Sequence, residues 1–186
     1  EMFFEDAKLV SQELDLVLTG RSAGVEEKVP MCGIPFHAAN SYIQRLVKKG
    51  YKVAICEQLE DPSSAKGLVD RGIIKIITPG TYMDATMDAK STNYMASCDV
   101  SSFEITVIYC ELSTGELKYQ TLQRSLVALQ KALLEQNVSE LVCPMTMDKK
   151  WMAALEEMDT MLISKHKKAN IDSEDCLLYT SPSPRD

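Results

Sequence analysis

The residues with the clearest chemical potential form a short apolar loop, Pro30-Met31-Cys32-Gly33-Ile34-Pro35-Phe36-His37. Two prolines and a glycine restrict its backbone, and it presents a methionine, an isoleucine and a phenylalanine with little charge. Rigid apolar wedges of this type suit the narrow groove of a duplex, where they can separate base steps. The alternative interpretation is a core-packing loop whose apolar residues face inward.

The densest basic cluster follows this loop in the chain and consists of Arg45, Lys48, Lys49 and Lys52. These cations could neutralise phosphates. A solvated helix end normally carries the same residues, so this cluster alone does not decide between the two interpretations.

Composition and motifs exclude several other classes of protein. The net charge of −7 excludes a generally basic nucleic-acid coat, although a local DNA-reading surface stays possible. No apolar run approaches the ~20 residues of a membrane span. Walker-type phosphate loops, Gly-x-Gly-x-x-Gly turns and Gly-x-Ser-x-Gly elbows are missing from the sequence. The six cysteines form no Cys-x-x-Cys pair and the two histidines are not spaced as zinc ligands, which favours buried, reduced thiols.

The elements that must position the apolar loop alternate between helices and strands. Apolar spacing predicts a helix over 4–18 and a second helix that starts near Ala39 and ends at Lys48-Lys49-Gly50. Two apolar runs predict a buried strand at 52–56 and a further strand at 72–77, closed by Thr78-Pro79-Gly80-Thr81. This order indicates a mixed α/β domain over 1–81.

A second pattern follows a polar, aperiodic stretch at 82–92, which we interpret as a linker. The sequence predicts a hairpin of strands 103–109 and 116–119 joined by Ser113-Thr114-Gly115. It then predicts a helix over about 125–136, a strand at 140–143 and a helix over 148–158. One face of the first of these helices carries Leu126, Leu129, Leu133 and Leu134.

Both ends of the chain look truncated. Glu1 lies inside an expected strand that leads into a helix, so we expect residues upstream of it. Residues 176–186 share none of the earlier periodicity, and their codons can spell a transposon-end adapter used in short-read library preparation. We therefore interpret 176–186 as translated adapter, not native sequence, and expect the second domain, 93–175, to be incomplete.

Several linked motifs resemble the MutS family of bacterial mismatch-repair proteins. They occur in that family's order and spacing: Glu1-Met2-Phe3-Phe4-Glu5-Asp6-Ala7, Val29 to Ala38, Val53-Ala54-Ile55-Cys56-Glu57-Gln58, Ile77 to Thr81 and Leu112 to Glu116. The resemblance covers essentially residues 1–160.

The resemblance implies a DNA-reading role for the first domain. In the family, the phenylalanine of a Phe-x-Glu motif stacks on a mispaired base from the minor groove and the glutamate hydrogen-bonds that base. Glu1 matches the glutamate, so we expect the motif's phenylalanine among the residues upstream of Glu1, whereas Phe3 and Phe4 lie after the motif. The family's minor-groove loop corresponds to Met31, Pro35, Phe36 and His37, with Phe36 where relatives often have tyrosine. Arg21 matches a DNA-proximal basic position.

The resemblance also implies a fold class and partners. The expected fold is α/β: a mixed-sheet mismatch-recognition domain followed by a partial ribonuclease-H-like connector domain. The implied partners are double-stranded DNA with mismatches or small loops, a second MutS subunit and a MutL-type protein, with no membrane. We expect no cofactor and no enzymatic activity in this chain, whereas the full-length relative is an ATPase that uses ATP and magnesium. The implied location is the bacterial cytoplasm, at the nucleoid.

Two alternatives remain open at this point. Residues 93–175 could form a ribonuclease-H-like nuclease, which needs several carboxylates that converge on two metal ions. The candidates are Asp99, Glu104, Glu111 and Glu116. The chain could also be a protein-docking module that does not read DNA.

Overall fold

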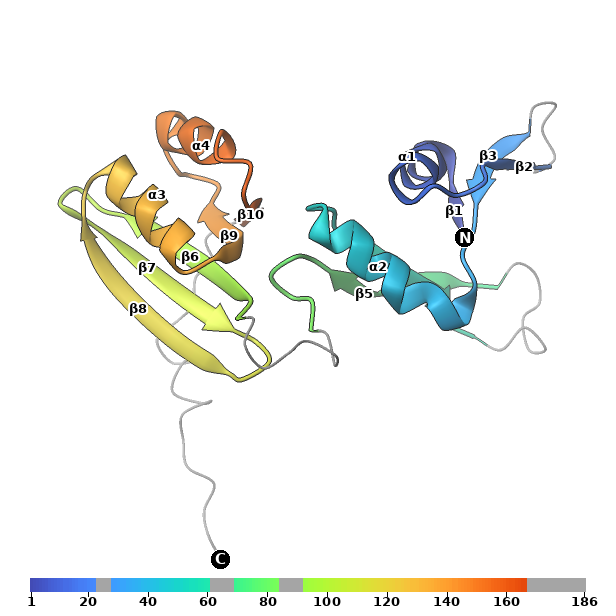
Figure 1. The fold of residues 1–186 in the computed structure, drawn as a ribbon, viewed down its shortest axis with the longest axis horizontal. Coiled ribbons are helices and arrows are strands. Elements are labelled where there is room, and N and C mark those ends of the chain that lie inside the picture. The colour runs from blue at the N-terminus through green and yellow to red at the C-terminus, as the bar shows by residue number, and fades with distance from the viewer. Residues whose placement is uncertain (23–27, 61–68, 84–91, 167–186) are drawn as a thin grey trace, which may run out of the picture.

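The computed structural model describes residues 1–22, 28–60, 69–83 and 92–166, which form two units (Figure 1). We call residues 1–83 the N-terminal unit and residues 92–166 the C-terminal unit. Most of the predicted linker and the whole of the predicted adapter segment, 176–186, lie outside the described residues. The mixed α/β fold class is confirmed.

The N-terminal unit begins with a three-stranded antiparallel sheet covered by a helix. The elements are β1 (Met2–Phe3), α1 (Phe4–Leu14), β2 (Thr19–Arg21) and β3 (Val29–Cys32). The strand order is β1-β3-β2, so β3 is central. The buried core under α1 consists of Ala7, Val10, Leu14, Cys32 and Leu46. The strand-to-helix start is confirmed, whereas the helix ends four residues before the predicted boundary and β2 was not expected.

A helix on a two-stranded hairpin completes this unit. After the 3₁₀ turn η1 (Phe36–Ala38) come α2 (Ala39–Lys48), β4 (Val53–Gln58) and β5 (Arg71–Ile77). Ile43, Val47 and Ile77 form a small core between helix and hairpin. The predicted strands at 52–56 and 72–77 are confirmed as β4 and β5, but the predicted burial of the first is wrong, because α2 covers only one face of the hairpin and leaves Ala54 and Cys56 exposed.

The C-terminal unit is one five-stranded mixed sheet with two helices. Its elements are β6 (Tyr94–Val100), β7 (Glu104–Glu111), β8 (Glu116–Gln123), α3 (Leu126–Glu135), β9 (Val138–Pro144), α4 (Lys149–Glu156) and β10 (Leu162–His166). The strand order is β10-β9-β6-β7-β8. β6, β7 and β8 are antiparallel neighbours, and β9 is parallel to both β6 and β10.

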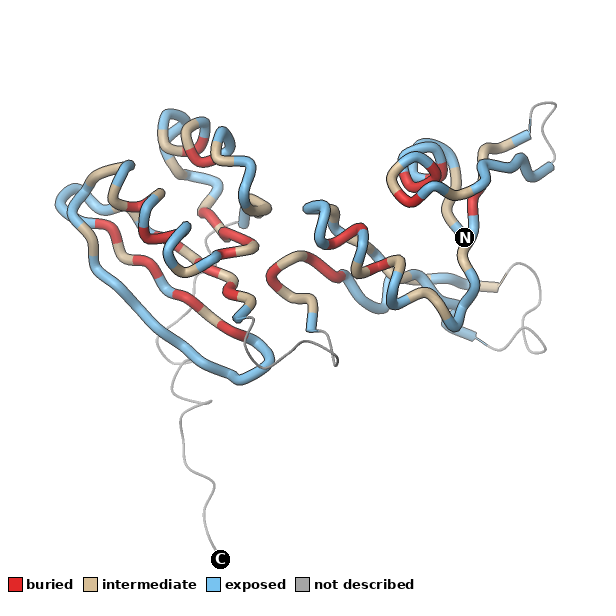
Figure 2. The backbone as a smooth tube through the Cα atoms, viewed as in Figure 1, coloured by how far each residue is buried: buried red, intermediate tan, exposed pale blue. Residues whose placement is uncertain are grey.

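Most of the buried residues belong to the C-terminal unit (Figure 2), where α3 and α4 contribute to one core with the sheet. The predicted hairpin and both predicted helices are confirmed. The predicted leucine face of α3 is partly wrong: Leu129 and Leu133 are buried, but Leu134 is 55% exposed. Strands β6 and β10 were not predicted.

The cysteines among the described residues are all free thiols. Cys32, Cys98 and Cys143 are buried as predicted, Cys110 is intermediate and Cys56 is exposed, contrary to the prediction. A thiol hydrogen bond with Cys143, together with burial, raises the pKa of Cys98. No helix in the described part of the chain is long and apolar enough to span a bilayer.

Candidate nucleic-acid interface

The structure brings Glu1 and Arg21 together at one end of the N-terminal unit. Met2 pairs with Cys32, so Glu1 lies next to Gly33 at the start of the loop that leads to α2 (Figure 1). The Glu1 Oε2 and Arg21 Nη1 atoms are 3.4 Å apart, and the two side chains are 56% and 59% exposed. An exposed pair of this kind contributes little to stability, so either group can exchange its partner for a ligand.

Met31 lies within the central strand of the sheet and is not among the exposed residues. Its strand neighbours are Phe3 on one side and Thr19 on the other, and the Thr19 hydroxyl donates to the Met31 carbonyl at 3.0 Å. The side chain is half-buried. Met31 therefore anchors the start of the loop within the central strand.

The loop beyond β3 turns its aromatic side chain outward. Pro35 holds φ at −62° at the start of η1, and the Ala38 N–H donates to the Pro35 carbonyl at 3.0 Å. Phe36 is 93% exposed, and His37 is exposed as well. The core-packing alternative is therefore correct for Cys32, which is fully buried, and wrong for Phe36.

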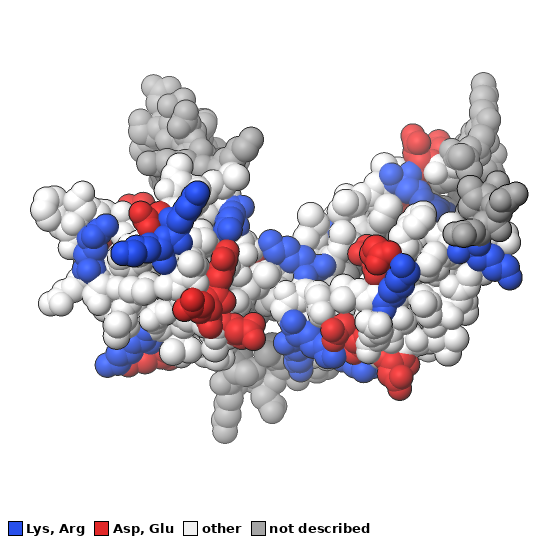
Figure 3. Space-filling model, turned by 90° about the horizontal axis from the view of Figure 1, so that it is seen from above, with Lys and Arg blue, Asp and Glu red and all other residues white. Residues whose placement is uncertain are grey.

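The predicted basic cluster does not join this surface. Helix α2 starts beside the loop and carries Lys48 and Lys49 at its other end, about 15 Å away at 1.5 Å per residue. Lys49 Nζ lies 2.6 Å from Glu13 Oε2, and Arg45 stacks over Tyr42. The view in Figure 3 likewise shows positive and negative side chains interspersed on both units.

Glu13 fixes the end of α2 against α1. Its carboxylate accepts hydrogen bonds from Lys49 Nζ at 2.6 Å and from the Tyr51 hydroxyl at 2.8 Å. The Lys49 hydrogen bond, followed by that of Tyr51, lowers the pKa of Glu13, and the bond to Glu13 raises the pKa of Tyr51. The ammonium group of Lys49 is thus already paired with Glu13 within the protein.

Phe4, which lies after the Phe-x-Glu motif in the resemblance, is an exposed aromatic residue. It is 63% exposed and adopts a φ of 53°, a left-handed conformation that costs a non-glycine residue roughly 1–2 kcal/mol. Its sequence neighbour Phe3 is half-buried in β1. Adjacent identical residues gave no signal of which one the strand-to-helix junction would expose.

The carboxylates of the nuclease alternative do not assemble into a metal site. Among the described residues, no group of three or more His, Cys, Asp and Glu side chains is placed to hold a metal ion. Glu116 instead accepts a hydrogen bond from the Tyr94 hydroxyl at 2.5 Å and pairs with Lys118. Hydrogen bonds from Tyr94 and Lys118 lower the pKa of Glu116.

The carboxylate of Glu111 is likewise engaged in hydrogen bonds within a turn. Its buried carboxylate accepts hydrogen bonds from the hydroxyls and backbone N–H groups of Ser113 and Thr114. The Thr114 hydroxyl is the main cause of a pKa of about 2 at Glu111, against the burial that opposes it. This carboxylate organises the β7–β8 hairpin.

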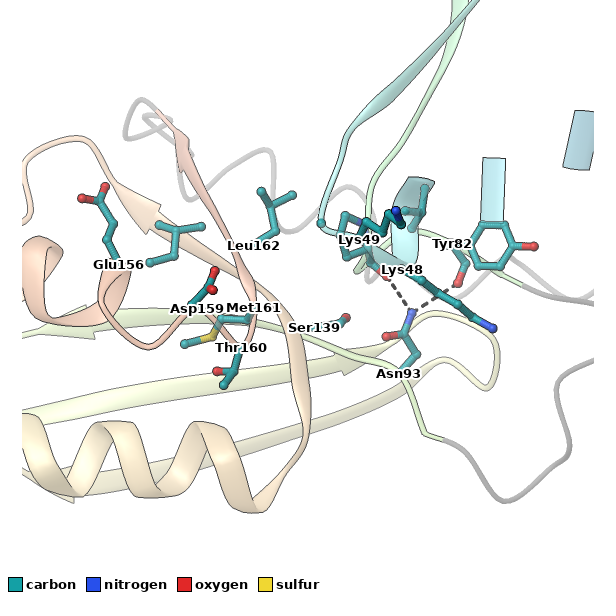
Figure 4. Close-up of a pocket in the computed structure, with 14 residues that line it drawn as sticks. Lys48, Lys49, Tyr82, Asn93, Ser139, Glu156, Asp159, Thr160, Met161 and Leu162 are labelled. Atoms are coloured by element: carbon teal, nitrogen blue, oxygen red, sulfur yellow. Dashed lines mark hydrogen bonds between the residues drawn. The ribbon is translucent and has the colours of Figure 1, made fainter. Parts of the chain in front are cut away.

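A groove of about 730 Å³ lies between the two units (Figure 4). Lys48 and Lys49 line one wall, and Glu156 and Asp159 line the other. Walls of opposite charge do not form a uniform phosphate-binding surface. The candidate nucleic-acid interface is therefore the end of the N-terminal unit that carries Glu1, Arg21 and Phe36.

Comparison with known proteins gives one consistent result. Residues 1–86 match the family MutS domain I. The DNA mismatch repair protein MutS of Clostridium botulinum (strain Loch Maree / Type A3) is 46% identical, over 92% of this chain and 19% of that protein. MutS of Clostridium tetani is 44% identical over 90% of this chain and 19% of its own length. The chain thus spans about a fifth of the length of these curated relatives.

A solved chain also aligns weakly with this one. It belongs to the simian T-cell lymphotropic virus intasome in complex with PP2A regulatory subunit B56 gamma. The alignment has a TM-score of 0.29 and 12% identity, over 48% of this chain and 39% of that chain, which is too low to indicate a shared fold.

Proposed function

Because residues 1–86 belong to the MutS domain I family, we propose that this chain recognises mispaired DNA by inserting apolar groups into the minor groove and kinking the duplex. The observation that carries the proposal is the exposed surface formed by Glu1 and the Phe36 loop. A stacked, fully paired duplex resists a wedge, whereas a mispair has already lost part of its pairing and stacking. A kink therefore costs least at the defect, which gives selectivity through deformability.

In this proposal the two exposed groups have different roles. Phe36 makes apolar contact in the groove, on a loop whose backbone Pro35 and the following 3₁₀ turn hold in place. Glu1 hydrogen-bonds the mispaired base, and its separation from Arg21 frees that guanidinium for a phosphate. His37 and Met31 support the loop from its two ends.

We further propose that the C-terminal unit is a connector and not a nuclease. Its three antiparallel strands followed by two parallel strands support the expected ribonuclease-H-like topology. The engagement of Glu111 and Glu116 in hydrogen bonds of their own supports a structural role for these carboxylates. ATP hydrolysis with magnesium, pairing with a second subunit and contact with a MutL-type protein would then belong to the longer protein, in the cytoplasm.

The test compares mismatched and matched duplexes of one length by fluorescence anisotropy, with the dimeric full-length protein that carries these residues. We expect tighter binding of the mismatched duplex, and loss of most of that preference in Glu1→Ala. Glu1→Gln should retain more of it, because an amide still hydrogen-bonds a base. Glu5→Ala is the matched control, since Glu5 is an exposed acid on the adjacent helix with its own partner, Lys8.

Equal affinity of the unaltered protein for both duplexes would refute the proposal. That result, together with binding of a MutL-type protein, would favour the protein-docking alternative.

A further inference from the structure

Glu140 is a buried carboxylate that receives donors from both units. It lies on β9 and is 4% exposed. The Thr78 hydroxyl and the Gly80 N–H donate to Oε2, the latter at 3.1 Å, and the Ser164 hydroxyl donates to Oε1 at 2.5 Å. Thr78 and Gly80 belong to the N-terminal unit, so this one carboxylate links β9 and β10 to the segment that follows β5.

The segment 78–81, which we call the Thr78 loop, is shaped to meet Glu140. The Thr81 N–H donates to the Thr78 carbonyl at 3.1 Å, and the Thr78 N–H donates to the Thr81 hydroxyl at 2.9 Å. These bonds curl the loop so that the Thr78 hydroxyl and the Gly80 N–H point to the same acceptor.

The fit leaves no room for a larger residue at Gly80. A Cβ atom added there would lie 2.8 Å from Glu140 Cβ and 3.0 Å from Met95 Cβ. Asn93 holds the loop from another side, since its Nδ2 donates to the Pro79 carbonyl at 2.8 Å. The C-terminal unit therefore contacts the Thr78 loop through β6 and β9 and through the residue before β6.

Burial makes this contact difficult to release. A buried carboxylate that loses its donors must regain water or remain unsatisfied, and both outcomes are costly. None of the ion pairs found in the described residues involves Glu140. Neutral donors thus satisfy the carboxylate, and two of the three leave together if the units separate.

The groove between the units depends on the same contact. Pro79 and Ser139, which flank the bonded residues in sequence, line it, with Lys48 on the N-terminal wall and Asp159 on the C-terminal wall (Figure 4). A change in the angle between the units would therefore change the width of the groove.

We propose that Glu140 is a positioning residue that locks the orientation of the N-terminal unit on the C-terminal sheet through the Thr78 loop. The lock fixes where the surface of Glu1 and Phe36 lies relative to the sheet. This inference concerns the link between the units and stands without the DNA-reading function.

Pulsed electron–electron double resonance on the full 186-residue chain, which measures the distance between two spin labels, tests the lock. One spin label is placed on Cys56, which is exposed in the N-terminal unit, and the other on Phe103→Cys in the C-terminal unit. Cys110→Ser and Cys176→Ser remove the competing thiols. We expect one narrow distance distribution, which Glu140→Ala broadens and shifts.

Two further variants separate the lock from a general loss of stability. Thr78→Val removes the hydroxyl that donates to Glu140 and that also contacts the Thr81 hydroxyl at 2.9 Å, while the bonds from the Thr78 N–H to the Thr81 hydroxyl and from the Thr81 N–H to the Thr78 carbonyl remain. This variant should also broaden the distribution. Glu111→Ala is the matched control, because Glu111 is a buried carboxylate of the same sheet that accepts hydrogen bonds from Ser113 and Thr114 in its own turn. An unchanged distribution in both Glu140→Ala and Thr78→Val overturns the proposal, as does equal broadening in Glu111→Ala.

Discussion

Replacing Phe36 by alanine should separate DNA binding from folding stability. Phe36 is 93% exposed, so folding covers only about 7% of it. For a side chain of about 200 Å² this is about 14 Å², worth ~0.4 kcal/mol at ~25 cal/mol per Å². A contact between an aromatic group and a base is worth roughly 1–3 kcal/mol, which corresponds to a roughly 5- to 150-fold loss of affinity.

The assay pairs two measurements on the full-length protein and its variant. Urea unfolding of the chain should change by less than about 0.5 kcal/mol. Anisotropy with a mismatched duplex should show the weaker binding, with a smaller change on the matched duplex. Phe103→Ala is the control, because Phe103 is 89% exposed in the C-terminal unit and should change neither measurement. Unaltered mismatch affinity in Phe36→Ala would refute the role of the loop.

Three further predictions concern stability. The Thr114 hydroxyl is the chief cause that lowers the pKa of Glu111 to about 2 in the folded state, so the ionised carboxylate stabilises the fold above the unfolded pKa of about 4.5. Urea unfolding between pH 7 and pH 2 should show that this stability is lost on acidification, with a smaller loss in Glu111→Gln. Asp15→Gly should raise the free energy of unfolding by about 1 kcal/mol, because Asp15 has a φ of 56° at the carboxyl end of α1, and no gain would contradict this. Leu129→Ala should lower the free energy of unfolding in urea by about 3–5 kcal/mol, whereas Leu134→Ala, on the exposed side of the same helix, should lower it by about 1 kcal/mol or less. Equal losses would contradict the orientation of α3 in the structure.

The elements that the sequence predicted correctly carry local signals at their boundaries. Gly50, with a φ of 87°, ends α2, and Gly115, with a φ of 73°, turns the β7–β8 hairpin. The Ser125 hydroxyl accepts a hydrogen bond from the Ala128 N–H at the start of α3. Each signal acts within a few residues, so the sequence alone was sufficient to find it.

The missed strands lack such signals. β6 is a central strand, yet it contains Ser97, Cys98 and Asp99, which weaken its apolar alternation. Its position depends on pairing with β7 and β9, and the latter strand is more than 35 residues away in sequence. The mistaken burial of Cys56 has the same origin, since only tertiary structure decides which face of a hairpin a helix covers.

The sequence identified the loop of the candidate site but not which of its side chains face the solvent. The apolar loop was identified from residue type and Cys32 was predicted to be buried, but the sequence left open whether Phe36 faces the core or the solvent, and the structure shows it 93% exposed. The sequence pattern identifies Glu140 only as the first residue of the apolar strand predicted at 140–143. Its signal was a carboxylate before Leu141-Val142-Cys143, and its partner Thr78 lies 62 residues earlier in the chain.

The distribution of buried residues gives the lock at Glu140 an energetic consequence. The C-terminal unit has one large core, whereas the N-terminal unit divides its buried residues between two small clusters, one of which includes Ile77 next to the Thr78 loop. Local stability follows the density of buried contacts, so β4 and β5 should open more readily than β6 and β9. Docking of the Thr78 loop on Glu140 ties the weaker cluster to the stronger core. Loss of that carboxylate should therefore speed amide hydrogen exchange in β5 more than in β7, even though Glu140 belongs to the sheet that contains β7.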